Sequence, residues 1–390
     1  MPAMRLGAAI LLLSAACWAA PAVSQKSSVD VLTRGQEVSS AVATVTSTAI
    51  SPLLGVCLLG IYDYTRTAPE ARAALPFYSR PHFWIPIGIL LLLIFFKDSV
   101  GGAVPLLKKP LDAVEVLIVN KAALILLAFP VMYHEVARLT GIRDIASLVV
   151  PPVYASTPGA LETAGHIGTA AAMLLAGTII TLVVWVVGHA ANVLALLSPV
   201  PYFDLGVKLF RAAILLTVVG CAIVNPTLGL IASLIVIGVS AILFWFALRL
   251  LILGSVFALD VLALAIAGRT ASPGTSIRAF TMGKIQGIPR RTLGRLSRDA
   301  NGILEFRYPR MMFGPARRVR LEDAAQYEVG RGLLYPSIVL PKGDTHELQF
   351  RLLPRYRGSE EEVRAALGMS AVRDLGFGKL MKSAKASAGF

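Results

Sequence analysis

The sequence contains few charged residues and few cysteines. Charged side chains make up only 15% of the 390 residues, against roughly 25% in soluble domains, whereas hydrophobic residues make up 56%. This balance excludes a disordered chain and a single soluble globular domain. Cys17, Cys57 and Cys221 all lie in apolar segments without a close spacing, which excludes a disulfide framework and a cysteine metal site. The composition indicates an integral membrane protein with a soluble appendage.

Common catalytic motifs are also missing. The chain has no GxxxxGKS/T loop, no HExxH and no GxSxG, and its five histidines show no ligand-like spacing. His134 and Glu135 form a pair that could hold a proton or a metal ion, although such a pair at a helix end is more often an interface anchor. We therefore predict no catalytic residue, no metal and no cofactor, and we expect that the protein is not an enzyme.

Positive charge is concentrated at one end of the chain. The net charge is +14, and residues 269–390 hold 22 Lys and Arg against 11 Asp and Glu. Residues 1–268 hold only 15 Lys and Arg against 12 Asp and Glu. Because Lys and Arg are retained on the cytoplasmic side of a membrane, the C-terminal part is predicted to be cytoplasmic.

The first residues have the pattern of a secretory signal. Arg5 supplies a positive start, Leu6–Ala16 is a short apolar core, and small residues around Ala22 fit a cleavage site. We predict a signal peptide over residues 1–24, followed by a periplasmic segment over residues 25–40. The alternative is an uncleaved first membrane helix.

Several hydrophobic runs follow. They are 41–62, 83–96, 116–133, 165–187, 207–224 and 228–253, the last continuing to Gly268 past Asp260. A periplasmic N-terminus and a cytoplasmic C-terminus require an odd number of spans. We expect that the run 41–62, rich in Ser and Thr and interrupted by Pro52, enters the membrane and returns without crossing. The alternative divides the last run into two tight spans near Arg249.

The predicted fold class is therefore a polytopic α-helical membrane bundle over residues 41–268, with about five to seven hydrophobic helices. Some of these helices are expected to be broken or re-entrant. The segments Lys97–Glu115 and Gly188–Arg211 are too apolar for free loops and too rich in Pro and Gly for spans. We expect that they form half-helices or interfacial hairpins that pack together.

The segments VPLLKKPLDAVE and SPVPYFD, in this order between hydrophobic helices, carry a resemblance. Over about residues 45–253 the chain resembles a family of uncharacterised bacterial inner-membrane proteins with Pro-rich hairpins. It departs from that family at Lys108 and Lys109 and by its C-terminal domain. The resemblance implies this architecture and a multi-pass location in the inner (plasma) membrane, and it brings no catalytic residues.

Ionisable and amide side chains at membrane depth form the main candidate site, because such groups are costly in lipid. The candidate polar cluster comprises Asp98, Asp112, Lys121, His189, Asn192, Asp204, Lys208 and Arg211. One interpretation is a polar cavity between the hairpins for a solute, an ion or a lipid headgroup. The other is a set of structural ion pairs. The spacing of Asp204, Lys208 and Arg211 predicts one helical face, with Arg211 as a second partner of the carboxylate.

After residue 268 the pattern changes to short alternating strands. The predicted strands are Ile303–Tyr308, Val319–Leu321, Tyr327–Val329, Ser337–Leu340 and Glu347–Leu353. Ser359, with Glu362 three residues later, predicts a capping box at the start of a helix that ends at Leu367. Residues 269–390 are thus expected to form a small antiparallel β domain closed by a helix, with a C-terminal tail. This layout resembles a bacterial pleckstrin-homology-like domain.

Basic residues at the start of this domain are candidate lipid-headgroup contacts. They are Lys284, Arg290, Arg291, Arg295 and Arg298. The alternative is an ordinary positive flank of the last membrane helix. The predicted partners are the lipid bilayer, with its anionic headgroups, and an unknown protein. Nucleic acid is not expected, since the basic residues are not interleaved with aromatics. The predicted function is a non-enzymatic membrane protein with a lipid- or protein-docking domain, and the alternative is a small transporter or channel.

Overall fold

The computed structural model describes residues 28–100, 111–140, 160–197, 203–267 and 274–375, except 284, 286, 310–314, 333–334 and 343–344. The chain divides into two compact units. The helical unit contains residues up to 108, 118–195 and 200–248, and the sheet unit contains 109–117, 196–199 and 249–390. Each unit is described by itself. The predicted signal peptide, residues 1–24, lies outside the described residues.

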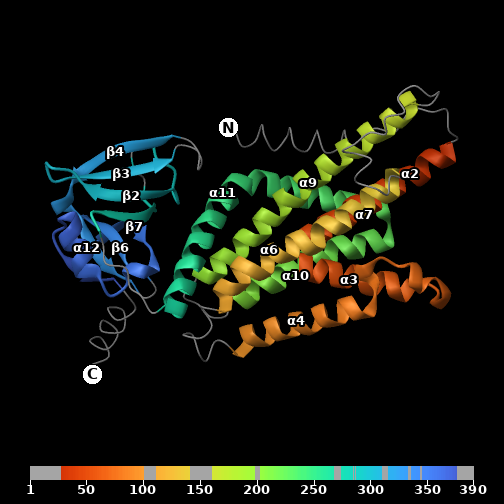
Figure 1. Ribbon diagram of the computed structural model, residues 1–390, viewed down its shortest axis with the longest axis horizontal. Helices are drawn as coiled ribbons and strands as arrows, with labels where there is room; N and C mark the ends of the chain where they lie inside the picture. Colours follow the sequence, from red (N-terminus) through yellow and green to blue (C-terminus); the bar gives the residue numbers. More distant parts are fainter. Residues whose placement is uncertain are drawn as a thin grey trace. The chain divides into compact units, whose positions relative to one another are not determined.

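Long apolar helices dominate the N-terminal two thirds of the chain (Figure 1). They are α2 (Ser28–Ile50), α3 (Pro52–Arg66), α4 (Pro81–Val100), α6 (Asn120–Ala123), α7 (Phe129–Thr140), α9 (Ala160–Leu197), α10 (Phe203–Val224) and α11 (Pro226–Ala267). Short 3-10 turns, η1 (Pro69–Ala74) and η2 (Phe77–Ser79), precede α4, while wider π turns, η3 (Glu115–Val119) and η4 (Leu124–Ala128), flank α6.

Five of the described helical stretches are long and apolar enough to cross a membrane. They are Pro81–Asp98, Leu111–Thr140, Gly168–Leu194, Phe203–Val224 and Pro226–Ile266. They coincide with five of the six hydrophobic runs, and the run 41–62 is the exception. The predicted multi-pass helical bundle is therefore confirmed at the level of fold.

The helices α2 and α3 form a hairpin with its break at Pro52. Ser51 is extended, with φ −148° and ψ 93°, and Pro52 begins α3. The backbone of Gly55 lies so close to α2 that a Cβ there would be 2.8 Å from the carbonyl oxygen of Ser47. The chain therefore folds back on itself (Figure 1). The predicted break is confirmed. The segment 25–40 is helical from Ser28 onward, because α2 begins there.

One expectation about broken segments is wrong, and another is tested only in part. α11 is one continuous helix of 42 residues, about 63 Å long, so the last run is not divided near Arg249. α4 continues through Lys97 to Val100, and α9 continues through Gly188 to Leu197. The described apolar residues at the start of the two Pro-rich segments extend these long helices, because hydrophobic side chains and internal hydrogen bonds favour continued helix there. The remaining residues, 101–110 and 198–202, lie outside the described residues.

The sheet unit contains an eight-stranded sheet in the order β4-β3-β2-β1-β7-β6-β5-β8. The strands are β1 (Ser276–Thr281), β2 (Leu293–Arg298), β3 (Ile303–Pro309), β4 (Ala316–Asp323), β5 (Glu328–Arg331), β6 (Ser337–Lys342), β7 (Thr345–Leu352) and β8 (Val372–Asp374). All neighbours are antiparallel except β5 and β8, which are parallel. The sheet is thus mixed rather than wholly antiparallel.

The short helix α12 (Glu360–Leu367) completes the sheet unit, as predicted. The predicted capping box is wrong, because the side chain of Ser359 makes no capping hydrogen bond. Instead the backbone N–H of Gly358 donates to Glu360 Oε1 at 3.1 Å. Val363 and Leu367 are fully buried and form the apolar face of this helix.

The hairpin predicts a contrast between two helical glycines. A methyl group at Gly55 would collide with the backbone of Ser47 and Thr48, whereas nothing lies within 4 Å of the corresponding position at Gly88 in α4. We expect that Gly55→Ala lowers stability by about 1–3 kcal/mol, as overpacking does, and that Gly88→Ala leaves it unchanged or raises it slightly. Thermal midpoints of the detergent-purified variants measure both effects. Equal midpoints would contradict the close approach of α2 and α3.

Candidate functional site

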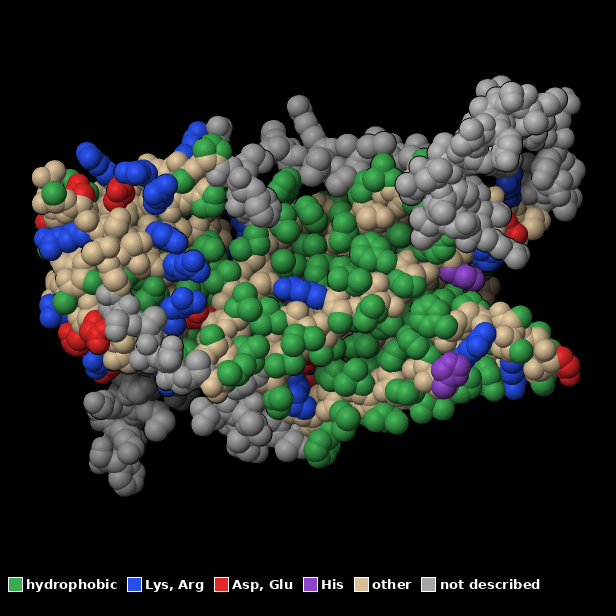
Figure 2. Space-filling model, viewed as in Figure 1, with side chains coloured by type: hydrophobic (Ala, Val, Ile, Leu, Met, Phe, Trp, Pro, Cys, Tyr) green, Lys and Arg blue, Asp and Glu red, His purple; other side chains and the backbone are tan. Residues whose placement is uncertain are grey.

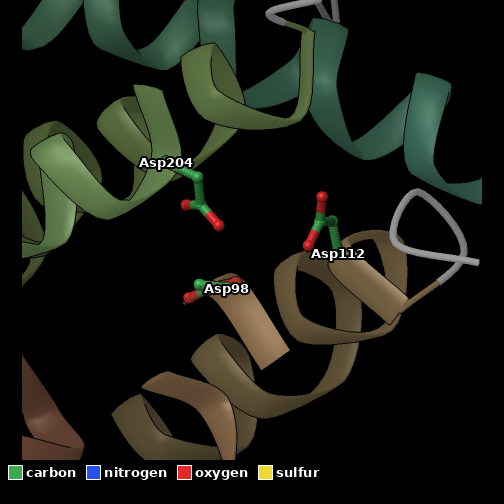
Figure 3. A group of neighbouring side chains, drawn as sticks. All are labelled: Asp98, Asp112 and Asp204. Atoms are coloured by element: carbon green, nitrogen blue, oxygen red, sulfur yellow. The ribbon is translucent and has the colours of Figure 1, made fainter. Parts of the chain in front are cut away.

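The predicted face of α10 lies against α4. Lys208 Nζ is 3.3 Å from Asp204 Oδ2, which confirms the pair spaced by four residues. A closer partner is Asp98 of α4, whose Oδ2 is 2.5 Å from the same Nζ. Asp98 is fully buried, and its other oxygen is 3.1 Å from Lys97 Nζ. Figure 3 shows the carboxylates of Asp98 and Asp204 approaching from their two helices.

Lys208 therefore holds two buried carboxylates together. The short spacing within α10 predicted Asp204, but Asp98 is 110 residues away in the sequence and no local pattern reveals it. Asp112 is also buried, in the helical stretch that begins at Leu111. It belongs to the sheet unit and is described apart from this pair. The ion pairs of Lys208 neutralise charge inside the bundle, which favours the structural interpretation of these residues.

Arg211 connects three further helices. Its Nη1 donates to Asn192 Oδ1 of α9 at 2.6 Å, and its Nη2 donates to the backbone oxygen of Ile50 at the end of α2. Asn192 Nδ2 in turn donates to Asn120 Oδ1 of α6 at 3.2 Å. Arg211 therefore has partners in α9 and α2 that distance in sequence had hidden.

His189 is the least satisfied member of the predicted cluster. It is 1% exposed, and its ring stacks on Trp185 one turn earlier in α9, with centroids 4.9 Å apart. Among the described residues, neither of its ring nitrogens has a hydrogen-bond partner. The remaining member, Lys121, lies half-buried in α6, next to Asn120 and between the two π turns. The cluster thus spans α4, α6, α9 and α10, with the hairpin end of α2 beside it.

A second polar cluster joins α3, η2 and α7. Ser79 Oγ donates to Asp63 Oδ2 at 2.8 Å, and the hydroxyl of Tyr78 is 3.1 Å from His134 Nδ1. Burial raises the pKa of Asp63, although the hydrogen bond from Ser79 opposes this shift. The sequence singled out His134 and Glu135 but not these partners from distant segments. The buried carboxylate of Glu135 pairs with Arg138 at 2.9 Å, so its charge is neutralised within α7.

Two of the candidate lipid-contact residues are part of the sheet, and two lie beside it. Arg295 and Arg298 lie in β2, and Arg290 and Arg291 lie in the turn before it. Arg291 has a φ of 63°, in the left-handed region. Lys284 lies outside the described residues. Lys and Arg side chains gather on the surface of this domain, whereas the visible helices carry mostly hydrophobic side chains (Figure 2).

Comparisons with protein-family models, with curated proteins and with solved structures find no match to the chain. The described residues therefore establish the architecture alone, with five long apolar helices and a C-terminal eight-stranded mixed sheet.

The ion pairs of Lys208 reverse an expectation drawn from the sequence. The spacing in the sequence predicts that Asp204→Ala, which leaves two cations unpaired, costs more than Lys208→Ala, which leaves Arg211 to compensate. In the structure Lys208→Met leaves Asp98 and Asp204 facing each other, whereas Asp204→Asn leaves Lys208 paired with Asp98. We now expect that Lys208→Met costs about 3 kcal/mol and Asp204→Asn about 1 kcal/mol, with partial recovery in the double variant. The yield and thermal midpoint of monodisperse protein measure this order, and the opposite order would contradict it.

Proposed function

We propose that this chain is a non-enzymatic multi-pass protein of the bacterial inner membrane that holds a docking domain at the cytoplasmic surface. The helical bundle serves as a platform, and the sheet domain contacts lipid or a protein partner. The pairing of Asp98, Asp204 and Lys208 supports a structural role for the bundle's charges. The basic surface of the sheet domain supports a docking role.

One observation carries this proposal, namely the joint between α11 and the sheet. Asp260 of α11 is 1% exposed, and it accepts a hydrogen bond from the backbone N–H of Arg355 at 2.8 Å and another from Arg355 Nε at 2.5 Å. The hydrogen bond to Asp260 raises the pKa of the Arg355 guanidinium. A buried carboxylate with a charged partner and a backbone donor is a strong fixed contact.

Aromatic packing supports the same joint. Phe257 of α11 is buried, and its ring lies 5.8 Å from that of Phe280 in β1 and 5.3 Å from that of Tyr335. The sheet domain is therefore attached to the last membrane helix by packing and by a paired charge, not merely by a linker. A domain attached in this way to a membrane helix is kept within reach of the bilayer surface.

The charge distribution supports the orientation. Five spans are an odd number, which fits a periplasmic start after signal cleavage and a cytoplasmic end beside the basic domain. The pleckstrin-homology-like layout has support from the strand order, in which a meander of β1 to β4 adjoins a meander of β5 to β7, followed by α12.

A small transporter or channel is the second candidate, and His189 favours it. A buried imidazole without a partner is costly unless a ligand or water satisfies it, and polar groups in membrane helices mark transport paths. A polar cavity reaching His189 would serve a solute, an ion or a lipid headgroup.

Reporter fusions test the orientation. We expect that a fluorescent protein fused after Phe390 is fluorescent and that a periplasmic phosphatase at the same site is inactive, because the basic domain is retained in the cytoplasm. The matched fusion after Glu70, in the loop between α3 and α4, should behave in the opposite way. Phosphatase activity at Phe390 would overturn the proposed orientation.

Thiol labelling separates the platform from the transporter. In a chain whose native cysteines are replaced, the His189→Cys variant should resist a membrane-impermeant thiol reagent, since position 189 is 1% exposed. The Val224→Cys variant, at a helix end and 79% exposed, is the control that should react. Reaction at position 189 from either side of the membrane would favour the transporter.

A further inference from the structure

Four arginines stand in one row across the first four strands of the sheet. Arg278 of β1 is directly opposite Arg295 of β2, which is opposite Arg307 of β3, which is opposite Arg318 of β4. Directly opposed residues of neighbouring strands point to the same face. All four side chains are exposed. The row therefore presents its positive charges on one face of the sheet.

An apolar row runs beside these arginines. Phe280, Leu293, Pro309 and Ala316 each lie two residues along a strand from an arginine of the row, and hence on the same face. Phe280 is the residue that packs against Phe257 of α11. The arginine row therefore begins two residues along β1 from the joint with the last membrane helix.

Like charges directly opposite one another destabilise a sheet. Within the described part of the chain, the row has one carboxylate partner, Glu305, whose Oε1 is 3.9 Å from Arg318 Nε, with 64% of the Arg318 side chain exposed. An exposed pair at this distance contributes little. The row thus retains a positive charge that an anionic partner would neutralise.

We propose that this face of the sheet docks on the anionic phospholipid headgroups of the bilayer in which the chain is anchored. The arginine row binds lipid phosphates, and Leu293, Pro309 and Ala316 of the apolar row face the boundary with the acyl chains. Phe280 stays buried against Phe257. Arginine suits this role because its planar guanidinium binds phosphate through two hydrogen bonds. This inference rests on the proposed function and names the partner of the docking domain.

Three features favour a membrane over a nucleic acid. The five candidate spans keep the chain in a bilayer, and the joint at Asp260 keeps the sheet attached to one of them. The residues beside the arginines on the side away from the apolar row are Ser276, Ser297, Glu305 and Arg320, so no aromatic ring is offered there for base stacking. An apolar row next to a cationic row matches the layering of a bilayer surface.

The test uses the full chain in lipid nanodiscs. A fluorophore is attached through Ser276→Cys, on the same face as Arg278, in a chain whose native cysteines are replaced. One set of discs contains phosphatidylcholine alone, and the other adds phosphatidylglycerol; both carry a lipid with a quencher on its headgroup. We expect strong quenching only in the discs with phosphatidylglycerol, and its loss at high salt.

The decisive variant is Arg295→Gln/Arg307→Gln. It should shift the ratio of docked to undocked domain about 30-fold, because each cation near an anionic surface contributes about 1 kcal/mol. The control Arg317→Gln/Arg357→Gln removes the same charge from exposed residues outside the row and should change quenching little. At low salt the row variant should also have a higher thermal midpoint than the control, since repulsion between neighbouring strands is relieved.

Quenching that does not depend on phosphatidylglycerol, or equal loss in the control, would overturn the lipid proposal. Tight binding of a single-stranded oligonucleotide by the discs, lost in the row variant, would assign the row to nucleic acid instead. If quenching is absent while the reporter at Phe390 is cytoplasmic, the lipid partner fails and a protein-docking platform stands. A periplasmic Phe390 would refute the orientation of the proposed function without deciding the lipid contact.

Discussion

The helical unit depends on the hydrogen bonds of one half-buried arginine, Arg211. α2 ends at Ile50, which is buried, and the last carbonyl groups of a helix lack partners within the helix. The Nη2 of Arg211 donates to Ile50, and its Nη1 donates to Asn192. A guanidinium keeps its charge in any protein environment, and a cation at the C-terminal end of a helix is favoured by the helix dipole. Arg211 therefore satisfies a carbonyl group at the end of α2, where the hairpin turns.

The composition of α2 suits this buried position. From Ser39 to Ile50 nearly every residue is buried, although the segment is rich in Ser, Thr and Ala rather than Leu and Phe. Small side chains let neighbouring helices approach closely. Their hydroxyl groups can donate hydrogen bonds to carbonyl groups of the preceding turn, as Thr48 does to Thr44. The hairpin of α2 and α3 is thus a polar-looking element at the centre of the bundle.

The sequence predicts contacts between residues that are close in the chain, and it does not reveal contacts between distant segments. The five long apolar helices follow from length and hydrophobicity, and the pair of Asp204 and Lys208 follows from a spacing of four residues. The contacts of Lys208 with Asp98 and of Arg211 with Ile50 join segments 110 and 161 residues apart, which no local pattern indicates.

The sheet follows the same rule. β3 to β7 have an alternating pattern, whereas β1 and β2 contain basic residues that resemble a membrane flank. Only the register of the strands, which tertiary packing fixes, brings Arg278, Arg295 and Arg307 into one row.

The continuity of α11 has a mechanical consequence. Its length of about 63 Å is roughly twice the hydrocarbon thickness of a bilayer, and it has no break between Pro226 and Ala267. A helix longer than the bilayer responds to a change in membrane thickness by tilting. The pair of Asp260 and Arg355 fixes the last turns of this helix to the sheet.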